Sequence, residues 1–426
     1  MTAKDGAQQA RPARWNPVSA VLSVVGVCAL IGLPFLRLAP NRMLSGEPVY
    51  FWDVVHNPAA AAKALTSPLA AAPAEALATT LSPAFFSVMF LGLLLALLVL
   101  PFTPPKRSAL WLQAVIASAL IAAWVALAGW QASQLVRPDL PFARTSLGGA
   151  FWALLVIFWL MATDALQRLK AGVAVQMALL TAVALSIGLL VAQGAWDDLS
   201  IMKEYANRSD VFAAAIARHV QIVLLALLPT LCLGVPLGWW ISRRSAVGQT
   251  LFPVLNIIQT IPSIALFGLL MAPLALLAAA WPWLARAGIS GVGMAPGVIA
   301  LMLYSLLPVV RGTLAGFEAV PSAVVTAARG MGMAPGKIFT GVELPLALPV
   351  LLAGVRTATI QAVGLATVTA LIGAGGLGAI MFEGLFSSAP DLVLLGVLPV
   401  IALAVLVDAL FKLLITLITP TRGPQP

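Results

Sequence analysis

The sequence predicts an all-α polytopic membrane protein, and three observations lead to that fold class. Of the 426 residues, 61% are hydrophobic and only 9% are charged. The mean hydropathy is +1.02, a value that soluble globular domains of this length do not show. Apolar runs recur at the length of about 20 residues that a helix needs to cross a bilayer core, which predicts about ten transmembrane helices.

The expected spans follow one another along the whole chain. They lie at residues 18–36, 84–101, 109–130, 150–166, 172–194, 219–242, 251–280, 297–316, 347–372 and 392–411. The first span has no convincing cleavage site after it, so we expect it to be retained as a helix. The segment 251–280 is long enough for a tilted or broken helix, and Pro253, Pro262 and Pro273 favour a break.

A polar run from Asp197 to Asp210 divides the chain. We expect residues 1–196 to form an N-terminal membrane region of about five spans. Residues 197–218 are expected to be an outer-face polar segment, and residues 219–420 a second membrane region. No convincing repeat relates the two halves, which disfavours an inverted-repeat carrier.

The distribution of basic residues predicts the orientation. With the N-terminus in the cytoplasm, fifteen of the 24 lysines and arginines fall on the cytoplasmic side and nine on the outer side. This is the asymmetry of the positive-inside rule. The net charge of +9 is therefore better explained by membrane topology than by nucleic-acid binding. The same topology places the turn 326–345 in the cytoplasm.

Few residues offer chemistry inside the expected spans. Asp164 and Asp408 each precede a basic residue by four positions, which indicates interfacial ion pairs with Arg168 and Lys412. The two cysteines fall within expected spans, and two histidines make no credible metal cluster. We expect no catalytic residue, metal or cofactor in this chain, and an energy source outside it.

Two glycine-rich segments resemble nucleotide motifs only superficially. Gly373–Gly378 fits G-x-G-x-x-G but follows an apolar helix rather than a strand, so a bend or close helix packing is expected. The segment Gly332–Ile338 has the wrong glycine spacing for a P-loop, and Ile338 stands where the magnesium-binding hydroxyl belongs. Neither segment predicts a nucleotide site.

The polar turn from Thr326 to Pro345 is the most informative segment. It predicts a short helical hairpin that leaves the membrane, exposes Gly332 and returns at Leu344. The turn resembles the coupling loop of ABC importer permeases, whose pattern is Glu-Ala-Ala, three residues, Gly, nine residues, Ile-x-Leu-Pro. The matching residues, with Thr for Glu and Val for Ile, are Thr326, Ala327, Ala328, Gly332, Val342, Leu344 and Pro345.

This resemblance implies a type I ABC importer permease core in the C-terminal half, with a cytoplasmic coupling loop at 318–346. It also implies partners: a cytoplasmic ATPase dimer that binds ATP and magnesium, a second permease subunit (a copy or a relative), and a periplasmic substrate-binding protein. The chain itself would be a multi-pass protein of the bacterial inner membrane. Small Ala327 and Ala328 would let a short helix sit close against the ATPase.

Further segments resemble permeases for glycine betaine, choline and related osmoprotectants. In the C-terminal half these are Asn256–Gly268, His219–Val223 and Leu371–Gly378. In the N-terminal half, Pro40–Arg42 with Gly46–Glu47, Ala143–Gly148 and Met202–Arg208 resemble the Yeh-type osmoprotectant permeases of Gram-negative bacteria.

Four polar residues are candidates for the translocation path. Asn256, Gln259, Thr260 and Ser263 are spaced i, i+3, i+4 and i+7, so one helix would carry them on one face. Such a face either lines the path or holds helices together, and both interpretations stay open. Three other functions also remain as alternatives: an ABC permease for an amino acid or another small solute, an ion-coupled secondary carrier, and a membrane sensor or scaffold that transports nothing.

Overall fold

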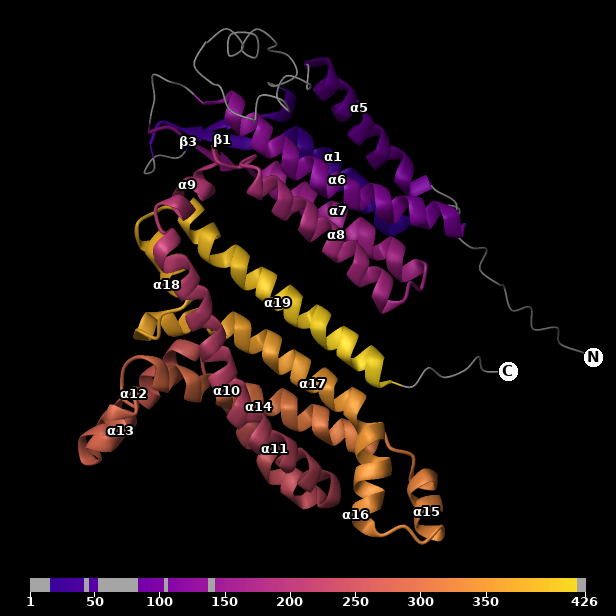
Figure 1. Ribbon diagram of the computed structural model, residues 1–426, viewed down its shortest axis with the longest axis vertical. Coiled ribbons are helices and arrows are strands. Elements are labelled where there is room, and N and C mark those ends of the chain that lie inside the picture. Colours follow the sequence, from indigo (N-terminus) through magenta and orange to yellow (C-terminus); the bar gives the residue numbers. More distant parts are fainter. Residues whose placement is uncertain (1–15, 42–45, 53–82, 103–105, 137–141, 420–426) are drawn as a thin grey trace, which may run out of the picture. The chain divides into compact units, whose positions relative to one another are not determined.

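The computed structural model describes residues 16–41, 46–52, 83–102, 106–136 and 142–419. Arg42 of the N-terminal motif therefore lies outside the described residues. The chain forms two compact units, Met1–Lys203 and Glu204–Pro426 (Figure 1). Each unit is built mainly from apolar helices, as the composition predicts.

Eight helical segments among the described residues are long and apolar enough to cross a membrane. They are Arg107–Gln134, Gly149–Arg168, Val173–Ala192, Ser209–Arg243, Ser263–Ala280, Met294–Glu318, Pro335–Leu365 and Pro390–Ile418. The expected spans 18–36 and 84–101 correspond to shorter helices, α1 (Pro17–Gly32) and α5 (Pro83–Val99). Helix α1 ends early because Leu33 precedes Pro34 and adopts extended backbone.

The first unit contains α1, α5, a 3₁₀ turn η1 (Leu100–Phe102), α6 (Arg107–Gln134), α7 (Gly149–Arg168) and α8 (Val173–Ala192). Its core is aromatic. Trp124 of α6 is 2% exposed, contacts the Phe35 ring at a centroid distance of 4.5 Å, and donates its indole N–H to the carbonyl of Phe151 at 3.1 Å. These contacts join α6, α7 and the start of a small sheet.

That sheet is a feature that the sequence analysis did not predict. Strands β1 (Leu36–Ala39), β2 (Glu47–Val49) and β3 (Arg144–Leu147) form an antiparallel sheet in the order β2-β1-β3. Gly148 directly follows β3. A Cβ atom on it would lie only 2.2 Å from the carbonyl oxygen of Pro34, so only glycine fits there. Strands of three or four residues carry too little alternation of polar and apolar residues to be predicted from the sequence.

A partly buried polar network ties α1 to α7. The Asn16 side-chain amide donates to Ser19 at 2.7 Å and to Asp164 at 2.6 Å. Its oxygen caps α1 at the Val18 N–H and accepts from Arg168 at 2.7 Å. The predicted Asp164–Arg168 ion pair is present at 2.9 Å and belongs to this larger network.

The other predicted pair, Lys412 with Asp408, is present at 2.8 Å, and Arg356 donates to the same carboxylate at 2.6 Å.

The second unit begins within the polar segment that the sequence predicts. Helix α9 covers Ser200–Ala206 and α10 runs from Ser209 to Arg243, so the last ten residues of the segment 197–218 already belong to a long helix. The remaining elements are α11 (Ser245–Thr260), α12 (Ser263–Ala280), α13 (Pro282–Arg286), α14 (Met294–Glu318), α15 (Ser322–Gly330), α16 (Pro335–Ile338), the π-helical segment η2 (Phe339–Glu343), α17 (Leu344–Leu365), η3 (Val368–Ile372), α18 (Leu377–Phe386) and α19 (Pro390–Ile418).

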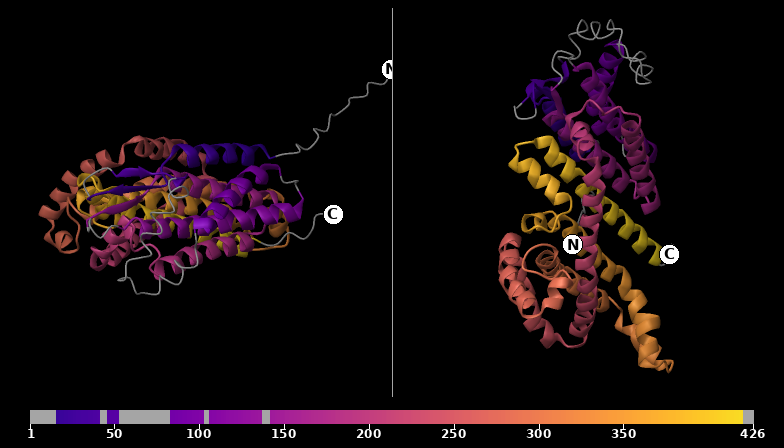
Figure 2. Two further views of the ribbon diagram at one scale, coloured as in Figure 1. Left: turned by 90° about the horizontal axis from the view of Figure 1, so that it is seen from above. Right: turned by 60° about the vertical axis from the view of Figure 1, so that its left-hand side comes forward.

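Helix α14 packs against α10 and α17 through glycines. A Cβ atom on Gly238 of α10 would lie 2.6 Å from the Cβ of Thr313, and one on Gly312 would lie 2.5 Å from the Cα of Gly354 in α17. Small residues at helix crossings allow the close backbone approach on which association in a bilayer depends. The three helices run side by side within this unit in Figures 1 and 2.

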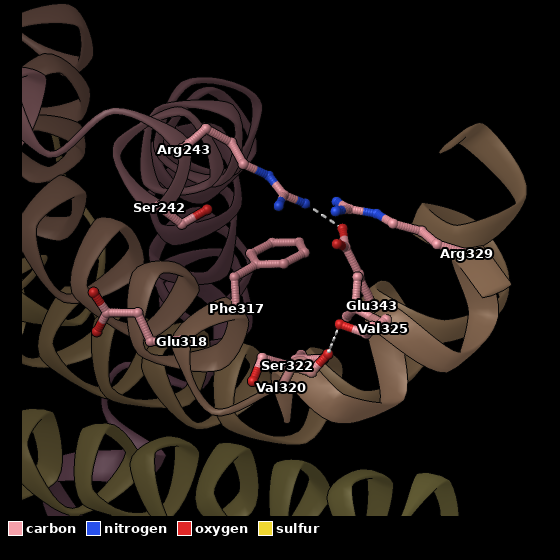
Figure 3. Close-up of a pocket in the computed structure, with 10 residues that line it drawn as sticks. Ser242, Arg243, Phe317, Glu318, Val320, Ser322, Val325, Arg329 and Glu343 are labelled. Atoms are coloured by element: carbon pink, nitrogen blue, oxygen red, sulfur yellow. Dashed lines mark hydrogen bonds and ion pairs between the residues drawn. The ribbon is translucent and has the colours of Figure 1, made fainter. Parts of the chain in front are cut away.

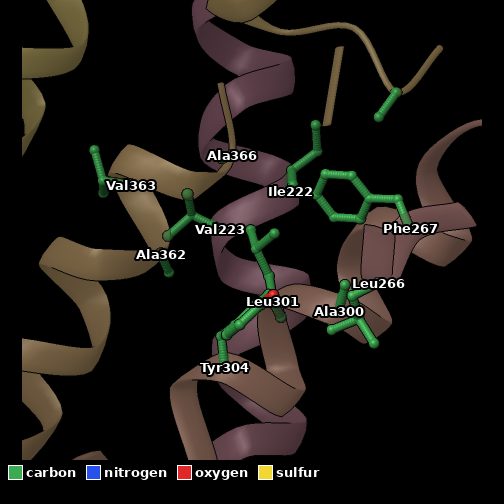
Figure 4. Close-up of a cluster of buried hydrophobic side chains, with 12 residues drawn as sticks. Ile222, Val223, Leu266, Phe267, Ala300, Leu301, Tyr304, Ala362, Val363 and Ala366 are labelled. Atoms are coloured by element: carbon green, nitrogen blue, oxygen red, sulfur yellow. The ribbon is translucent and has the colours of Figure 1, made fainter. Parts of the chain in front are cut away.

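A buried apolar cluster joins this helix group to α12 (Figure 4). Its fully enclosed members include Ile222 of α10, Phe267 of α12 and Leu301 of α14. The predicted break in segment 251–280 occurs at one proline only. Pro253 and Pro273 lie inside α11 and α12, whereas Pro262 separates these two helices.

The glycine-rich segment Gly373–Gly378 forms a tight loop, in agreement with the predicted bend. Gly373, Gly375 and Gly376 have φ angles of +81°, +81° and +80°, a left-handed conformation that favours glycine. A Cβ atom on Gly378 would lie 1.9 Å from the Thr367 carbonyl oxygen. A helix follows this segment, as in the nucleotide fingerprint, but the glycines here let the chain reverse direction and pack closely.

Candidate functional site

The predicted turn is a helical hairpin between α14 and α17. Helix α15 carries Thr326, Ala327 and Ala328, and α17 begins at Leu344 with Pro345 in its first turn. Because η2 runs directly into α17 with helical backbone, Pro345 removes one N–H from a continuous helical run, and the π-helical segment lies just before it. The hairpin lies at one end of α14 and α17 in Figure 1.

Gly332 ends α15 in a Schellman arrangement. Its N–H donates to the Arg329 carbonyl at 3.0 Å, and the following N–H of Met333 donates to the Ala328 carbonyl at 3.2 Å. This cap needs a left-handed residue, and Gly332 has φ +77°. No atom lies within 4 Å of the position where a Cβ would stand. The glycine therefore closes the helix and leaves an open surface beside exposed Met331.

The two alanines of the motif have different surroundings. Ala328 is only 2% exposed and packs inside this chain, whereas Ala327 is exposed. The hydroxyl of exposed Thr326 donates to the Ser322 carbonyl at 2.9 Å. Of the two alanines that we expected against a partner, only Ala327 remains accessible for that contact in this structure.

A cavity of about 270 Å³ lies at the base of the hairpin (Figure 3). It is lined by Ser242, Arg243, Phe317, Glu318, Val320, Ser322, Val325, Thr326, Arg329 and Glu343. Arg243, at the end of α10, forms an ion pair with Glu343, at the end of η2. The Glu343 side chain is only 8% exposed and that of Arg243 is 42% exposed.

Aromatic rings hold the returning arm of the hairpin beside this ion pair. The Phe339 ring lies 5.8 Å from Trp239 of α10, edge to face, and 5.9 Å from Phe317 of α14, stacked. The Arg243 guanidinium lies 5.9 Å above the Trp239 ring, within the range of a cation–π interaction. We call Trp239, Phe317 and Phe339 the aromatic clamp.

Sequence reasoning missed the ion pair and the clamp. One signal was available, because Glu343 is the only acidic residue between Glu318 and Glu383. A lone acid beside the Leu344-Pro345 motif suggests a specific partner. Its partner Arg243 lies 100 residues away in sequence, and nothing local identifies that pairing.

The four candidate path residues do not share one helix face. Helix α11 ends at Thr260, and Ser263 is the first residue of α12, because Pro262 interrupts the helix. Gln259 donates to the Tyr304 carbonyl of α14 at 2.9 Å, which is a helix-to-helix contact. Asn256 is exposed and accepts from Arg311 at 2.9 Å, and exposed Thr260 donates to its own helix at Ile257.

The apolar helical core and the exposed, glycine-capped hairpin agree with the membrane permease that the sequence resembles. Residues 232–419 match the family described as "Binding-protein-dependent transport system inner membrane component". Residues 14–86 and 69–202 match "ABC transporter permease YehY, N-terminal domain". The chain belongs to the permease family of binding-protein-dependent ABC importers, in which the permease is a non-enzymatic membrane component and the ATPase is a separate chain.

Curated relatives correspond to about half of this chain. The choline transport system permease protein OpuBB of Bacillus subtilis is 38% identical over 202 residues, which cover 47% of this chain and 86% of that protein. The osmoprotectant import permease protein OsmW of Salmonella typhimurium is 36% identical over 214 residues, covering 50% and 94%. Among solved structures, a chain of the inward-facing methionine transporter MetNI aligns with a TM-score of 0.42 and 21% identity over 50% of this chain and 98% of that chain.

Proposed function

We propose that this chain is the permease subunit of an importer for glycine betaine, choline or a related osmoprotectant. The support for the solute class comes from the relatives, whose names include a choline permease, an osmoprotectant permease and a glycine betaine/carnitine/choline permease. A periplasmic binding protein delivers the solute to the outer face, and binding of ATP and magnesium by the partner ATPases drives the change of access.

The hairpin 322–343 is the proposed docking site for the ATPase. The observation that carries this proposal is Gly332, which caps α15 with φ +77° and has no neighbouring atom at its Cβ position. The surface around it is accessible to a partner, and Met331 beside it is 75% exposed. Thr326 and Ala327 are exposed on the outgoing arm and Val342 is half-buried on the returning arm, with Ala328 buried inside the hairpin.

The assembly contains two copies of the ATPase and a second permease subunit, either a copy of this chain or a relative. The N-terminus and the hairpin lie in the cytoplasm, as the excess of basic residues on that side supports. The solute passes along α11 and α12, beside Asn256, Thr260 and Ser263. Gln259 contributes by fixing α11 to α14.

Co-purification in mild detergent tests the docking site. Gly332→Trp should abolish recovery of the ATPase, because the indole would occupy the docking surface. Gly288→Trp is the matched control, because Gly288 has φ +81° and equally open surroundings. It lies before α14, at the end of that helix away from the hairpin, whereas Gly332 lies after it. Loss of the ATPase with both variants, or with neither, would contradict docking at the hairpin.

Uptake measurements test the solute and the energy source. Membrane vesicles with the complete transporter should accumulate radiolabelled glycine betaine or choline when ATP is supplied on the cytoplasmic side, and an ionophore should leave uptake unchanged. Uptake that follows the ion gradient would indicate a secondary carrier. Uptake of an amino acid but not of glycine betaine or choline would support an ATP-driven importer and contradict the proposed solute class.

A further inference from the structure

Glu343 is a carboxylate in a position where a charge is costly. Its side chain is 8% exposed, and it ends the η2 segment immediately before α17 begins. An enclosed carboxylate needs a partner of opposite charge and hydrogen bonds to offset its desolvation. Arg243 supplies both from the end of α10. The pair therefore links the returning arm of the hairpin directly to a long helix of the core.

A second guanidinium faces the same carboxylate. Arg329 belongs to α15, the outgoing arm of the hairpin, and points toward Glu343 across the cavity in Figure 3. Glu343, on the returning arm, thus lies between the outgoing arm of the hairpin and α10. Glu318 also lines the cavity but points away from Glu343 in the same view. The two acids of this cavity are therefore not equivalent.

The aromatic clamp restricts how the returning arm can move. Phe339, at the start of η2, contacts Trp239 of α10 and Phe317 of α14, while Glu343, at its end, is held by Arg243. The segment between them is π-helical. This geometry is rare in proteins, but where it occurs it is frequently at a functional site. Because η2 is attached at both ends, a displacement of the hairpin carries α10 with it.

We propose that Glu343 is a positioning residue for transport, which transmits movement of the docked hairpin to α10 through Arg243. The inference rests on the proposed docking of an ATPase at this hairpin. Docking itself depends on the exposed surface around Gly332, whereas the Glu343–Arg243 pair converts docking into helix movement. Glu343 contacts neither ATP nor solute in this role.

The test uses the complete transporter in proteoliposomes, with ATPase recovery, ATP hydrolysis and solute uptake measured on the same preparation. The solute is radiolabelled glycine betaine or choline, whichever the wild type takes up. Glu343→Gln should retain the bound ATPase but transport roughly tenfold less solute per ATP hydrolysed, or lower still, in the range typical of coupling between sites. Glu383→Gln, the matched control, removes an acid whose ion pair with Arg208 lies outside the hairpin and should equal the wild type in all three measurements.

Exchange of the two charges tests whether the ion pair itself carries the coupling. In a background carrying Arg329→Gln, so that residue 343 faces no second guanidinium, the double variant Arg243→Glu with Glu343→Arg should recover much of the transport that each single variant loses. Arg243→Lys should retain an intermediate ratio, because lysine keeps the charge but not the planar guanidinium.

Three results would overturn the inference. If Glu343→Gln transports as much solute per ATP hydrolysed as the wild type, the Glu343–Arg243 pair does not transmit hairpin movement to α10. Failure of the exchanged variant to improve on the single variants would show that the ion pair does not carry the coupling. Loss of the ATPase from Glu343→Gln would make Glu343 a docking residue and leave the proposed function intact, whereas absence of the ATPase from the wild type would reject the proposed function itself.

Discussion

Gly312 of α14 and Gly354 of α17 let two membrane helices meet at backbone distance. We expect Gly354→Val to lower the stability of the protein by about 1–3 kcal/mol, the usual cost of overpacking. Gly364→Val is the control, because Gly364 lies on the same helix with no atom within 4 Å of its Cβ position. Thermal unfolding in detergent should show a lower melting temperature for the first variant only.

Asn16 is the central residue of the polar network in the first unit. It caps α1 and contacts Ser19, Asp164 and Arg168. Asn16→Ala removes the side-chain cap of α1 and the hydrogen bonds to Ser19, Asp164 and Arg168, and we expect a loss of about 1–3 kcal/mol. Asn207→Ala, at an exposed position, should change the melting temperature little. Equal melting temperatures for the two variants would show that the network does not stabilise the unit.

At the scale of elements, the break between α11 and α12 depends on Tyr304 as well as on Pro262. The Tyr304 hydroxyl donates to the Ile261 carbonyl at the break. An unsatisfied carbonyl is costly in a bilayer core, so Tyr304→Phe should destabilise the protein by about 1–3 kcal/mol. Tyr205→Phe, at a more exposed position, is the control in the same thermal assay. An unchanged melting temperature for Tyr304→Phe would show that water or another donor satisfies this carbonyl.

At the scale of the whole molecule, α14 should place its two ends on opposite sides of the membrane. In a chain whose cysteines at 28 and 232 are replaced by alanine, we expect Val292→Cys to react with an impermeant maleimide added to spheroplasts. Met331→Cys, beside Gly332 and 75% exposed, should react only in inside-out vesicles. The opposite pattern would reverse the orientation that the basic residues predict.

Much of the fold follows from local sequence. Apolar segment length predicts the long helices, because a bilayer admits only backbones that satisfy their own hydrogen bonds. Proline favours an interruption because it restricts the residue before it and lacks an N–H, although the predicted span 18–36 runs past Pro34, before which α1 ends. The small sheet and the division of segment 251–280 at only one of three prolines could not be predicted, since both depend on neighbours distant in the chain.

For the candidate site, the sequence by itself determined the membrane class, the position of the hairpin and the exposed glycine that turns it at Gly332, because spacing and glycine conformation are local properties. Only the tertiary structure decided that Ala328 faces inward, that Asn256 and Ser263 lie on different helices, and that Glu343 meets Arg243. The physical reason is that such contacts arise from helix packing, which brings together side chains 100 residues apart.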